Sequence, residues 1–112
     1  KGVILATHAA RATASTTAGV DNAAATTAGG VAYLGASVLA LGSYTNVIIT
    51  VEDSANNSSF ATIGTFTAIT AVPASQRLEI AGTIRRYTRT LATFTGSGSS
   101  ESVTSAVGLA RN

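Results

Sequence analysis

Apolar and polar residues alternate along residues 46–91 of this chain. The alternation runs through NVIITVED, stops at SANNSS, and resumes in FATIGTFTAIT and RLEIAGTIRRYTRTL. A period of two places successive side chains on opposite faces of an extended strand, and Asn, Ser and Gly supply the turns between strands. The pattern therefore predicts half-buried antiparallel strands joined by short loops.

The same alternation predicts which side chains face the core. In NVIITVED the inward side chains are expected to be Val47, Ile49 and Val51. In the C-terminal segment VTSAVGLAR one face is expected to carry Val103, Val107 and Leu109. Both segments are therefore predicted to contribute one face to a hydrophobic core.

Residues 31–41, VAYLGASVLAL, predict a further strand. Tyr33 and Leu39 fall on one side of this strand, and Leu34 and Val38 fall on the other. Because both sides carry large apolar side chains, we expect both faces of the strand to be buried.

The number and spacing of these segments predict the fold class. About seven or eight short strands, roughly a dozen residues apart, indicate an all-β domain built as an antiparallel, jelly-roll-like β-sandwich. Gly82 lies between two alternating runs, where it marks either a break between two strands or a bulge in one long strand. We expect the β-sandwich domain to span residues 31–112.

Residues 1–30 differ from the rest of the chain. GVILATHAA could form a short strand or an extended arm, whereas ARATASTTAGVDNAAATTAGG has no large apolar side chain besides Val20. Asp21 and Asn22, next to Gly19, are typical of a turn. A segment with so little to bury becomes ordered only when something else holds it. We expect an extended, weakly structured segment that packs on a neighbouring subunit as an arm or loop.

Composition limits the classes of protein to be considered. A chain of 112 residues forms one domain, and the absence of Cys excludes disulfides and thiolate metal sites. Charged residues make up only 11% of the chain, against about 25% in typical proteins. Because charge normally keeps monomers apart, this indicates a protein whose faces are covered by neighbours. A secreted or low-complexity-leaning domain with a Thr- and Ser-rich surface is the alternative.

Membrane and nucleic-acid binding are not favoured by the sequence. No run approaches the roughly 18 consecutive apolar residues of a membrane span, and GVILA is too short for the core of a signal peptide. The chain begins at Lys1 without Met, which we interpret as a processed form or a fragment. The net charge of +2 rests on few groups, whereas nucleic-acid binding requires a clustered basic face with aromatic side chains to stack on.

Catalytic patterns are poorly supported, and we expect the protein not to be an enzyme. His8 is the only histidine, no acid lies near it in the sequence, and no segment resembles the GxSxG nucleophile turn. Glu52 and Asp53 are adjacent, so in a strand they point to opposite faces and cannot share a substrate. We interpret this pair as a polar turn that opens the loop of residues 52–59.

That loop, EDSANNSS, supplies oxygen atoms that a cation could use. It lacks the D-x-[DN]-x-[DN]-G spacing and the distal Glu of a calcium-binding loop of the EF-hand type. Asn and Ser also form turns through hydrogen bonds to their own backbone. We therefore expect an Asx-rich hairpin turn, no metal site and no cofactor.

The segment TIRRYTRT is the densest cluster of functional-looking residues. On a strand, Arg85, Tyr87 and Arg89 share one side, and Arg86 lies on the other. Arg and Tyr could stack on a sugar or base, or they could form a subunit interface, where both residue types are enriched. Alternatively, the arginines pair within the chain with Glu52, Asp53, Glu79 or Glu101. We favour the interface, formed by Arg85, Arg86, Tyr87 and Arg89.

VEDSANNSSFATIGTFTAIT, QRLEIAGTIRRYTRT and SAVGLARN resemble a β-sandwich module in the tail proteins of long-tailed bacteriophages, the major tail or tail tube proteins. The resemblance extends over residues 20–112. It implies a virion structural protein that polymerises into stacked rings around a channel for DNA. The implied partners are copies of itself and other virion proteins, with at most weak, non-specific contact with DNA. A capsid decoration or fibre protein is the alternative.

The turn pattern of residues 53–60 followed by the RRYTR strand is also similar to discoidin-like, carbohydrate-binding jelly rolls. In that family the strand is structural, and the ligand site lies in loops at one end of the sandwich. Such loops usually present exposed aromatic residues and acids. The chain has no Trp and only 5% aromatic residues, which argues against sugar binding.

Overall fold

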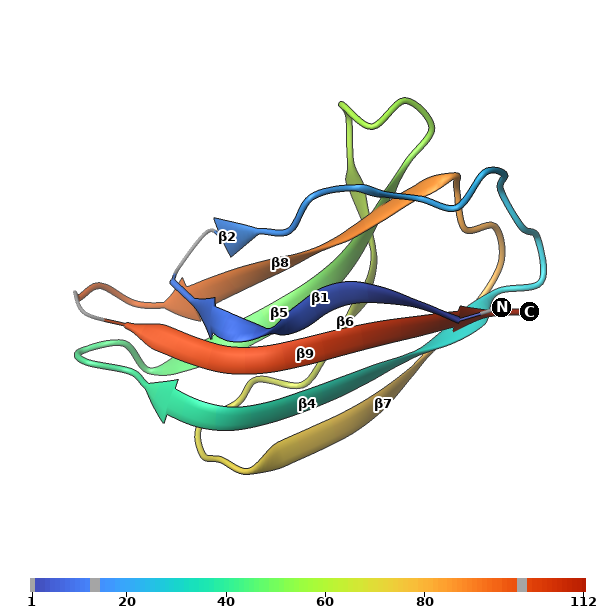
Figure 1. The fold of residues 1–112 in the computed structure, drawn as a ribbon. Helices are drawn as coiled ribbons and strands as arrows, with labels where there is room; N and C mark the ends of the chain where they lie inside the picture. The colour runs from blue at the N-terminus through green and yellow to red at the C-terminus, as the bar shows by residue number, and fades with distance from the viewer. Residues whose placement is uncertain (1, 13–14, 99–100) are drawn as a thin grey trace.

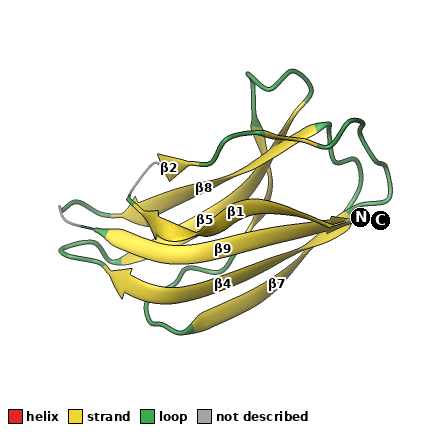
Figure 2. Cartoon of the chain, in the orientation of Figure 1, coloured by secondary structure: helices red, strands yellow, loops and turns green. Residues whose placement is uncertain are grey.

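The computed structural model describes residues 2–12, 15–98 and 101–112 of the chain (Figure 1). This part of the chain forms antiparallel sheets and contains no helix (Figure 2). Its strands are β1 (Gly2–Arg11), β2 (Ser15–Thr16), β3 (Val20–Asp21), β4 (Gly30–Ala40), β5 (Asn46–Ser54), β6 (Ala61–Thr65), β7 (Ala74–Ile80), β8 (Tyr87–Thr95) and β9 (Ser102–Arg111). Two sheets pack against each other, so the predicted antiparallel β-sandwich is confirmed.

The strands divide into a front sheet and a back sheet (Figure 1). The front sheet has the order β1-β9-β4-β7, and the back sheet has the order β2-β8-β5-β6, with β3 also paired to β8. Chain neighbours such as β4 and β5 lie in different sheets, so the chain repeatedly crosses the sandwich. The two ends of the described chain lie side by side at one end of the front sheet, because Gly2 is paired with Ala110.

The N-terminal residues contribute a full strand, which corrects the expected arm for residues 2–11. Strand β1 pairs with β9 from Gly2 opposite Ala110 to Arg11 opposite Val103, with two irregularities in the register. Leu5 is only 3% exposed and belongs to the core. Burial of the apolar residues in this segment stabilises its pairing with the sheet. Within residues 15–21 the two-residue strands β2 and β3 pair with β8.

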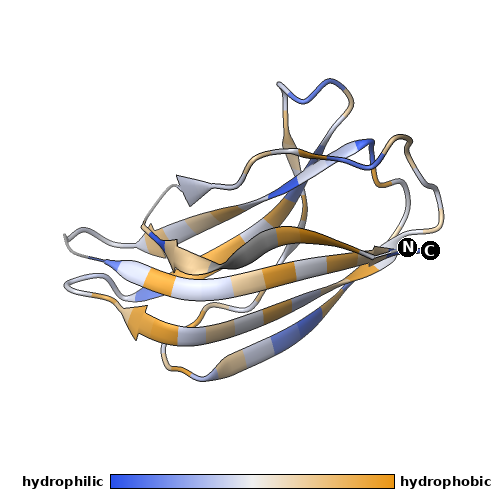
Figure 3. Cartoon of the chain, in the orientation of Figure 1, coloured by the Kyte–Doolittle hydropathy of each residue, from blue (hydrophilic) through white to orange (hydrophobic). Residues whose placement is uncertain are grey.

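The core lies between the two sheets and is built from alternate side chains of their strands. The inward facing predicted for β5 and β9 is confirmed, since all six aliphatic side chains are buried: Val47, Ile49, Val51, Val103, Val107 and Leu109. The alternation is also visible along β9 and β4, where hydrophobic and more polar segments follow one another (Figure 3). Period-two patterning was therefore sufficient to place these strands.

Strand β4 departs from the expectation that both of its faces are buried. Tyr33 is 51% exposed and Val38 is 55% exposed. The front sheet packs on the core with its inner face only, so alternate side chains of β4 face outward. The register also shifts between Ala36 and Val38, which turns Val38 outward and lets Leu39 pack against the core.

Gly82 separates two strands, as one of the two interpretations held. β7 ends at Ile80 in the front sheet and β8 begins at Tyr87 in the back sheet. Gly82 has φ of +81°, a left-handed conformation that glycine adopts without steric cost. The residues around it therefore carry the chain from one sheet to the other.

Ile84, in this crossing, is fully buried. Its backbone exchanges two hydrogen bonds with Thr26, and its side chain belongs to the core. Replacing it, Ile84→Ala, should lower the free energy of unfolding by about 2–5 kcal/mol, because a buried cavity forms. Urea denaturation followed by circular dichroism measures this loss.

The matched control is Ile4→Ala, since Ile4 is 67% exposed. Measured at concentrations at which the chain is monomeric, this change should cost about 1 kcal/mol or less. Equal losses for the two variants would contradict the described packing.

Candidate functional site

The predicted cluster Arg85–Arg89 lies at the start of β8 and in the crossing before it. Arg85 donates from Nε and Nη2 to Oδ1 of Asp53, at 2.9 and 2.8 Å. Its backbone N–H donates to the other carboxylate oxygen at 2.9 Å, and Nη2 also donates to the Asp53 carbonyl at 2.8 Å. The Asp53 side chain is only 3% exposed and that of Arg85 is 37% exposed. One buried carboxylate therefore holds both the side chain and the backbone of Arg85.

Glu52 and Asp53 belong to β5, so the expectation that they form a polar turn is wrong. Glu52 lies directly opposite Arg89, and Asp53 lies directly opposite Thr88. Because Thr88 is buried and neighbouring residues alternate between faces, Asp53 faces the interior and Glu52 faces outward. The two carboxylates are both nearly buried and pair with different arginines, Asp53 with Arg85 and Glu52 with Arg89, as expected for opposite orientations. Backbone pairing with β6 and β8 continues through both residues, and each carboxylate has an arginine partner.

Arg89 forms a second pair on the outer face of the back sheet. Its Nε donates to Oε1 of Glu52 at 2.7 Å, and its guanidinium lies 3.9 Å from the centre of the Phe60 ring. Stacking on an aromatic ring and pairing with a cross-strand acid use the guanidinium face and edge together. Phe60 was not singled out from the sequence, although it directly follows the Asx-rich loop.

Arg86 pairs with Asp21, a partner that the sequence did not identify. Its Nε and Nη2 donate to the two carboxylate oxygens of Asp21 at 2.7 and 2.8 Å. These bonds, and then one from the backbone N–H of Ala23, lower the pKa of the Asp21 carboxyl to about 2. The pair is about half exposed, and the Arg86 guanidinium also lies over the Tyr87 ring at 5.1 Å.

Asn22 joins the same end of the sandwich through its side chain. Its Nδ2 donates to the carbonyl of Arg86 and to the Thr88 hydroxyl, both at 3.0 Å. Arg111, at the end of β9, donates from Nη1 to the Ala24 carbonyl at 2.8 Å. We call the set of Asp21, Asn22, Asp53, Arg85, Arg86, Thr88 and Arg111 the polar end. It ties the segment after β3 to β8 and β9, and it ties the crossing before β8 to β5.

The pairing of arginines within the chain, one of the open alternatives, is therefore observed for Arg85, Arg86 and Arg89. Two of the expected acids, Glu52 and Asp53, are partners, whereas Glu79 pairs with Arg77. The predicted subunit interface at Arg85, Arg86, Tyr87 and Arg89 stays a prediction. Its charges are already satisfied, so it would offer a neighbour few unpaired donors.

The loop after β5 forms the expected Asx-rich turn. Oδ1 of Asn56 accepts the backbone N–H groups of Ser58 and Ser59, each at 3.0 Å. Asn57 has φ of +59°, which Asn tolerates better than most residues. Within the described ranges no cluster of three or more His, Cys, Asp or Glu could hold a metal ion. The hydroxyl oxygen of Ser54 likewise accepts the backbone N–H of Asn56, at 3.1 Å.

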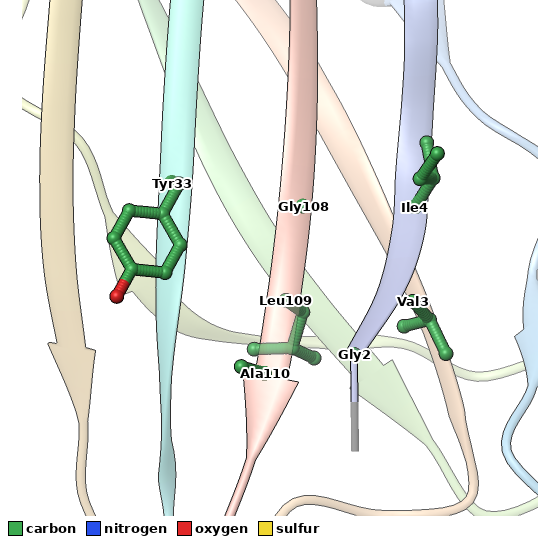
Figure 4. Close-up of a pocket in the computed structure, with 7 residues that line it drawn as sticks. All are labelled: Gly2, Val3, Ile4, Tyr33, Gly108, Leu109 and Ala110. Carbon is green, nitrogen blue, oxygen red and sulfur yellow. The ribbon is translucent and has the colours of Figure 1, made fainter.

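A second surface was not predicted from the sequence: the outer face of the front sheet. Among the described residues, the large hydrophobic side chains that remain exposed are Ile4, Tyr33 and Val38, and all of them lie on this face. A shallow apolar groove of about 330 Å³ runs over Gly108, between Ile4 on β1 and Tyr33 on β4 (Figure 4). The face is thus apolar and hollowed at its centre.

Comparison of the chain with models of known protein families and with curated proteins found no match. In the part of the chain that the structure describes, no helix is long and apolar enough to cross a membrane. The described residues present two candidate surfaces: a polar end in which Arg85 and Arg86 are paired with acids, and a sheet face with an open apolar groove.

The Asp53–Arg85 pair can be tested by removing the carboxylate. Asp53→Ala should lower the free energy of unfolding by about 2–4 kcal/mol, because the Arg85 backbone N–H and part of its guanidinium lose their buried acceptor. The estimate is below the full cost for a buried pair because Arg85 is partly exposed.

Denaturation with urea measures this change. Glu79→Ala is the control, since the Arg77–Glu79 pair is exposed on both sides. At concentrations at which the chain is monomeric, it should leave the midpoint nearly unchanged. A midpoint for Asp53→Ala equal to that of the control would contradict the structural role of the pair.

The Asp21–Arg86 pair predicts a pH dependence. Because the pKa of Asp21 falls from 3.8 to about 2 on folding, the pair stabilises the fold above about pH 4, and this contribution is lost as the pH falls towards 2. A carboxyl-carbon NMR titration should place the Asp21 midpoint near 2 in the native chain. In Arg86→Gln the midpoint should move up towards 3.8. A native midpoint close to 3.8 would show that the pair does not form in solution.

Proposed function

We propose that the protein is a structural subunit that associates with copies of itself and acts through a surface rather than through a pocket. The observation that carries this proposal is the outer face of the front sheet, where Ile4, Tyr33 and Val38 are all more than half exposed. Soluble monomers rarely leave large apolar side chains gathered on one face, and such faces usually mark interaction sites.

The distribution of charge supports the same proposal. Only 11% of the residues are charged, and Arg85, Arg86 and Arg89 are paired with acids of the same chain. Few charges are left to oppose association. Contact through Arg85, Arg86, Tyr87 and Arg89 is a second possible interface in the assembly, formed by side chains that already have partners.

The form of the assembly is proposed from the sequence motifs. Their resemblance to tail tube proteins favours stacked rings around a DNA channel in a virion, and a capsid decoration or fibre protein would use the same surface in another lattice. A sugar-binding role is less well supported, because Tyr33 is the one exposed aromatic side chain of the described residues.

Sedimentation equilibrium of the purified chain over a wide concentration range tests the proposal. The average mass should rise with concentration, and electron microscopy of the largest species should show rings, tubes or filaments. A monomer at every concentration would contradict self-assembly.

Two matched variants identify which surface is used. Tyr33→Ser removes an exposed ring from the front sheet, and Tyr87→Ser removes a half-buried ring beside Arg86. We expect Tyr33→Ser to weaken association about tenfold or more, because central aromatic residues dominate interfaces, and Tyr87→Ser to leave it nearly unchanged. The reverse result would move the interface to Arg85–Arg89.

A further inference from the structure

Two neighbouring rows of outward side chains cross the front sheet, one residue from each strand. The strand registers align the members of each row: Gly2, Ala110, Val31 and Glu79 in the first row, and Ile4, Gly108, Tyr33 and Arg77 in the second. Successive members of one strand are two residues apart, so both rows lie on the same face. The rows therefore form a small grid on the open side of the sandwich.

The two rows differ in size at every apolar position. In the second row Ile4 and Tyr33 stand on either side of Gly108, which forms the floor of the apolar groove (Figure 4). In the first row the members on β1 and β4 are smaller, namely Gly2 and Val31. Each large side chain is thus two residues along its own strand from a smaller one.

The members of the two rows on β7 are charged, and this strand is coloured as hydrophilic in Figure 3. Arg77 ends the second row and Glu79 ends the first, with Nη1 3.3 Å from Oε1. Their side chains are 55% and 76% exposed, so both can reach beyond the sheet. The grid therefore carries one cation and one anion side by side.

We propose that a second copy of the chain packs face to face on the front sheet, about a two-fold axis that crosses the strands between these two rows. This inference rests on the proposed self-association and names one of its interfaces. Because a two-fold contact closes at a dimer, rings or filaments require a further contact elsewhere on the chain. The axis places the second row of one copy over the first row of the other. Ile4 then meets Gly2 of the second copy, Tyr33 meets Val31, and Arg77 meets Glu79.

Self-complementarity is the reason for choosing a second copy as the occupant. A two-fold interface uses the same patch on both subunits, so each patch must contain both halves of every contact. This grid contains them: large beside small, and cation beside anion. Sheets packed face to face lie about 10 Å apart with strands within about 30° of alignment, a spacing at which facing side chains interdigitate.

Charge reversal tests the proposed pairing of Arg77 with Glu79 of the second copy. Arg77→Glu or Glu79→Arg alone would place like charges opposite each other at both symmetry-related positions. Each should raise the dissociation constant of the dimer about tenfold. The double variant Arg77→Glu/Glu79→Arg restores opposite charges and should return the constant to within about threefold of the original.

A second variant tests the groove without touching the charges. A Cβ at Gly108 would meet only the Val3 carbonyl oxygen, at the ordinary contact distance of 3.7 Å, so Gly108→Lys should fold. It fills the groove with a cation and should abolish the dimer. Thr93→Lys adds the same side chain to an exposed position of the back sheet and should leave the dimer intact.

Sedimentation equilibrium measures the dissociation constants, and thermal denaturation followed by circular dichroism checks that each variant is folded. Weakening by each single reversal, restoration by the double variant and loss with Gly108→Lys would support the two-fold. If the native chain assembles but these variants behave like it, or if the double variant does not restore association, the two-fold is overturned while self-assembly stands. A native chain that stays monomeric overturns both proposals.

Discussion

The buried carboxylate of Asp53 is the constraint on which the arrangement of the two sheets depends. A charge withdrawn from water must be paired and hydrogen-bonded, and Arg85 supplies a guanidinium and a backbone N–H to this one group. Arg85 lies in the crossing from β7, in the front sheet, to β8, in the back sheet. The pair therefore anchors the point at which the chain changes sheets, and with it the start of β8.

Strand β8 in turn organises the back sheet. It pairs with β5 over nine positions and with β2 and β3 along its other edge. The Arg86–Asp21 and Asn22–Thr88 contacts hold the extended segment around β3 against the same strand. In a chain with so few charged residues, these pairs use much of the available charge at one end of the sandwich. The outer face of the front sheet is left with an apolar centre and with the Arg77–Glu79 pair at its margin, which suits contact with an equally apolar partner.

Period-two patterning predicted the β-sandwich and the facing of β5 and β9, because these strands are regular along their buried sides. The pattern did not predict the position or facing of a strand where a tertiary contact or a local irregularity determines it. The shift after Ala36 reverses the facing of Val38, and no residue type in that segment signals it. β1 gains its place from pairing with β9 at the far end of the chain, which local composition does not reveal.

The charged cluster was recognised, yet its chemistry depends on distance in space. Glu52 and Asp53 are predictable as partners because side chains of opposite charge often pair across neighbouring strands. The sequence around Asp21 is typical of a turn. Its pairing with Arg86 is not predictable from that local sequence, because the two residues are 65 positions apart. The apolar groove is not predictable from the sequence, because it forms over Gly108 of β9, between side chains of the two neighbouring strands. Gly108 lies opposite both Ile4 and Tyr33 only in the folded sheet.

The central claim is that the outer face of the front sheet is the surface through which copies of the chain meet. A dilution series followed by amide NMR tests it most directly, because each resonance reports on its own residue. The account predicts concentration-dependent shifts centred on Tyr33, Gly108 and Arg77, with little change at Arg85–Arg89. Shifts centred on Arg85–Arg89, or spectra that do not change with concentration, would contradict it.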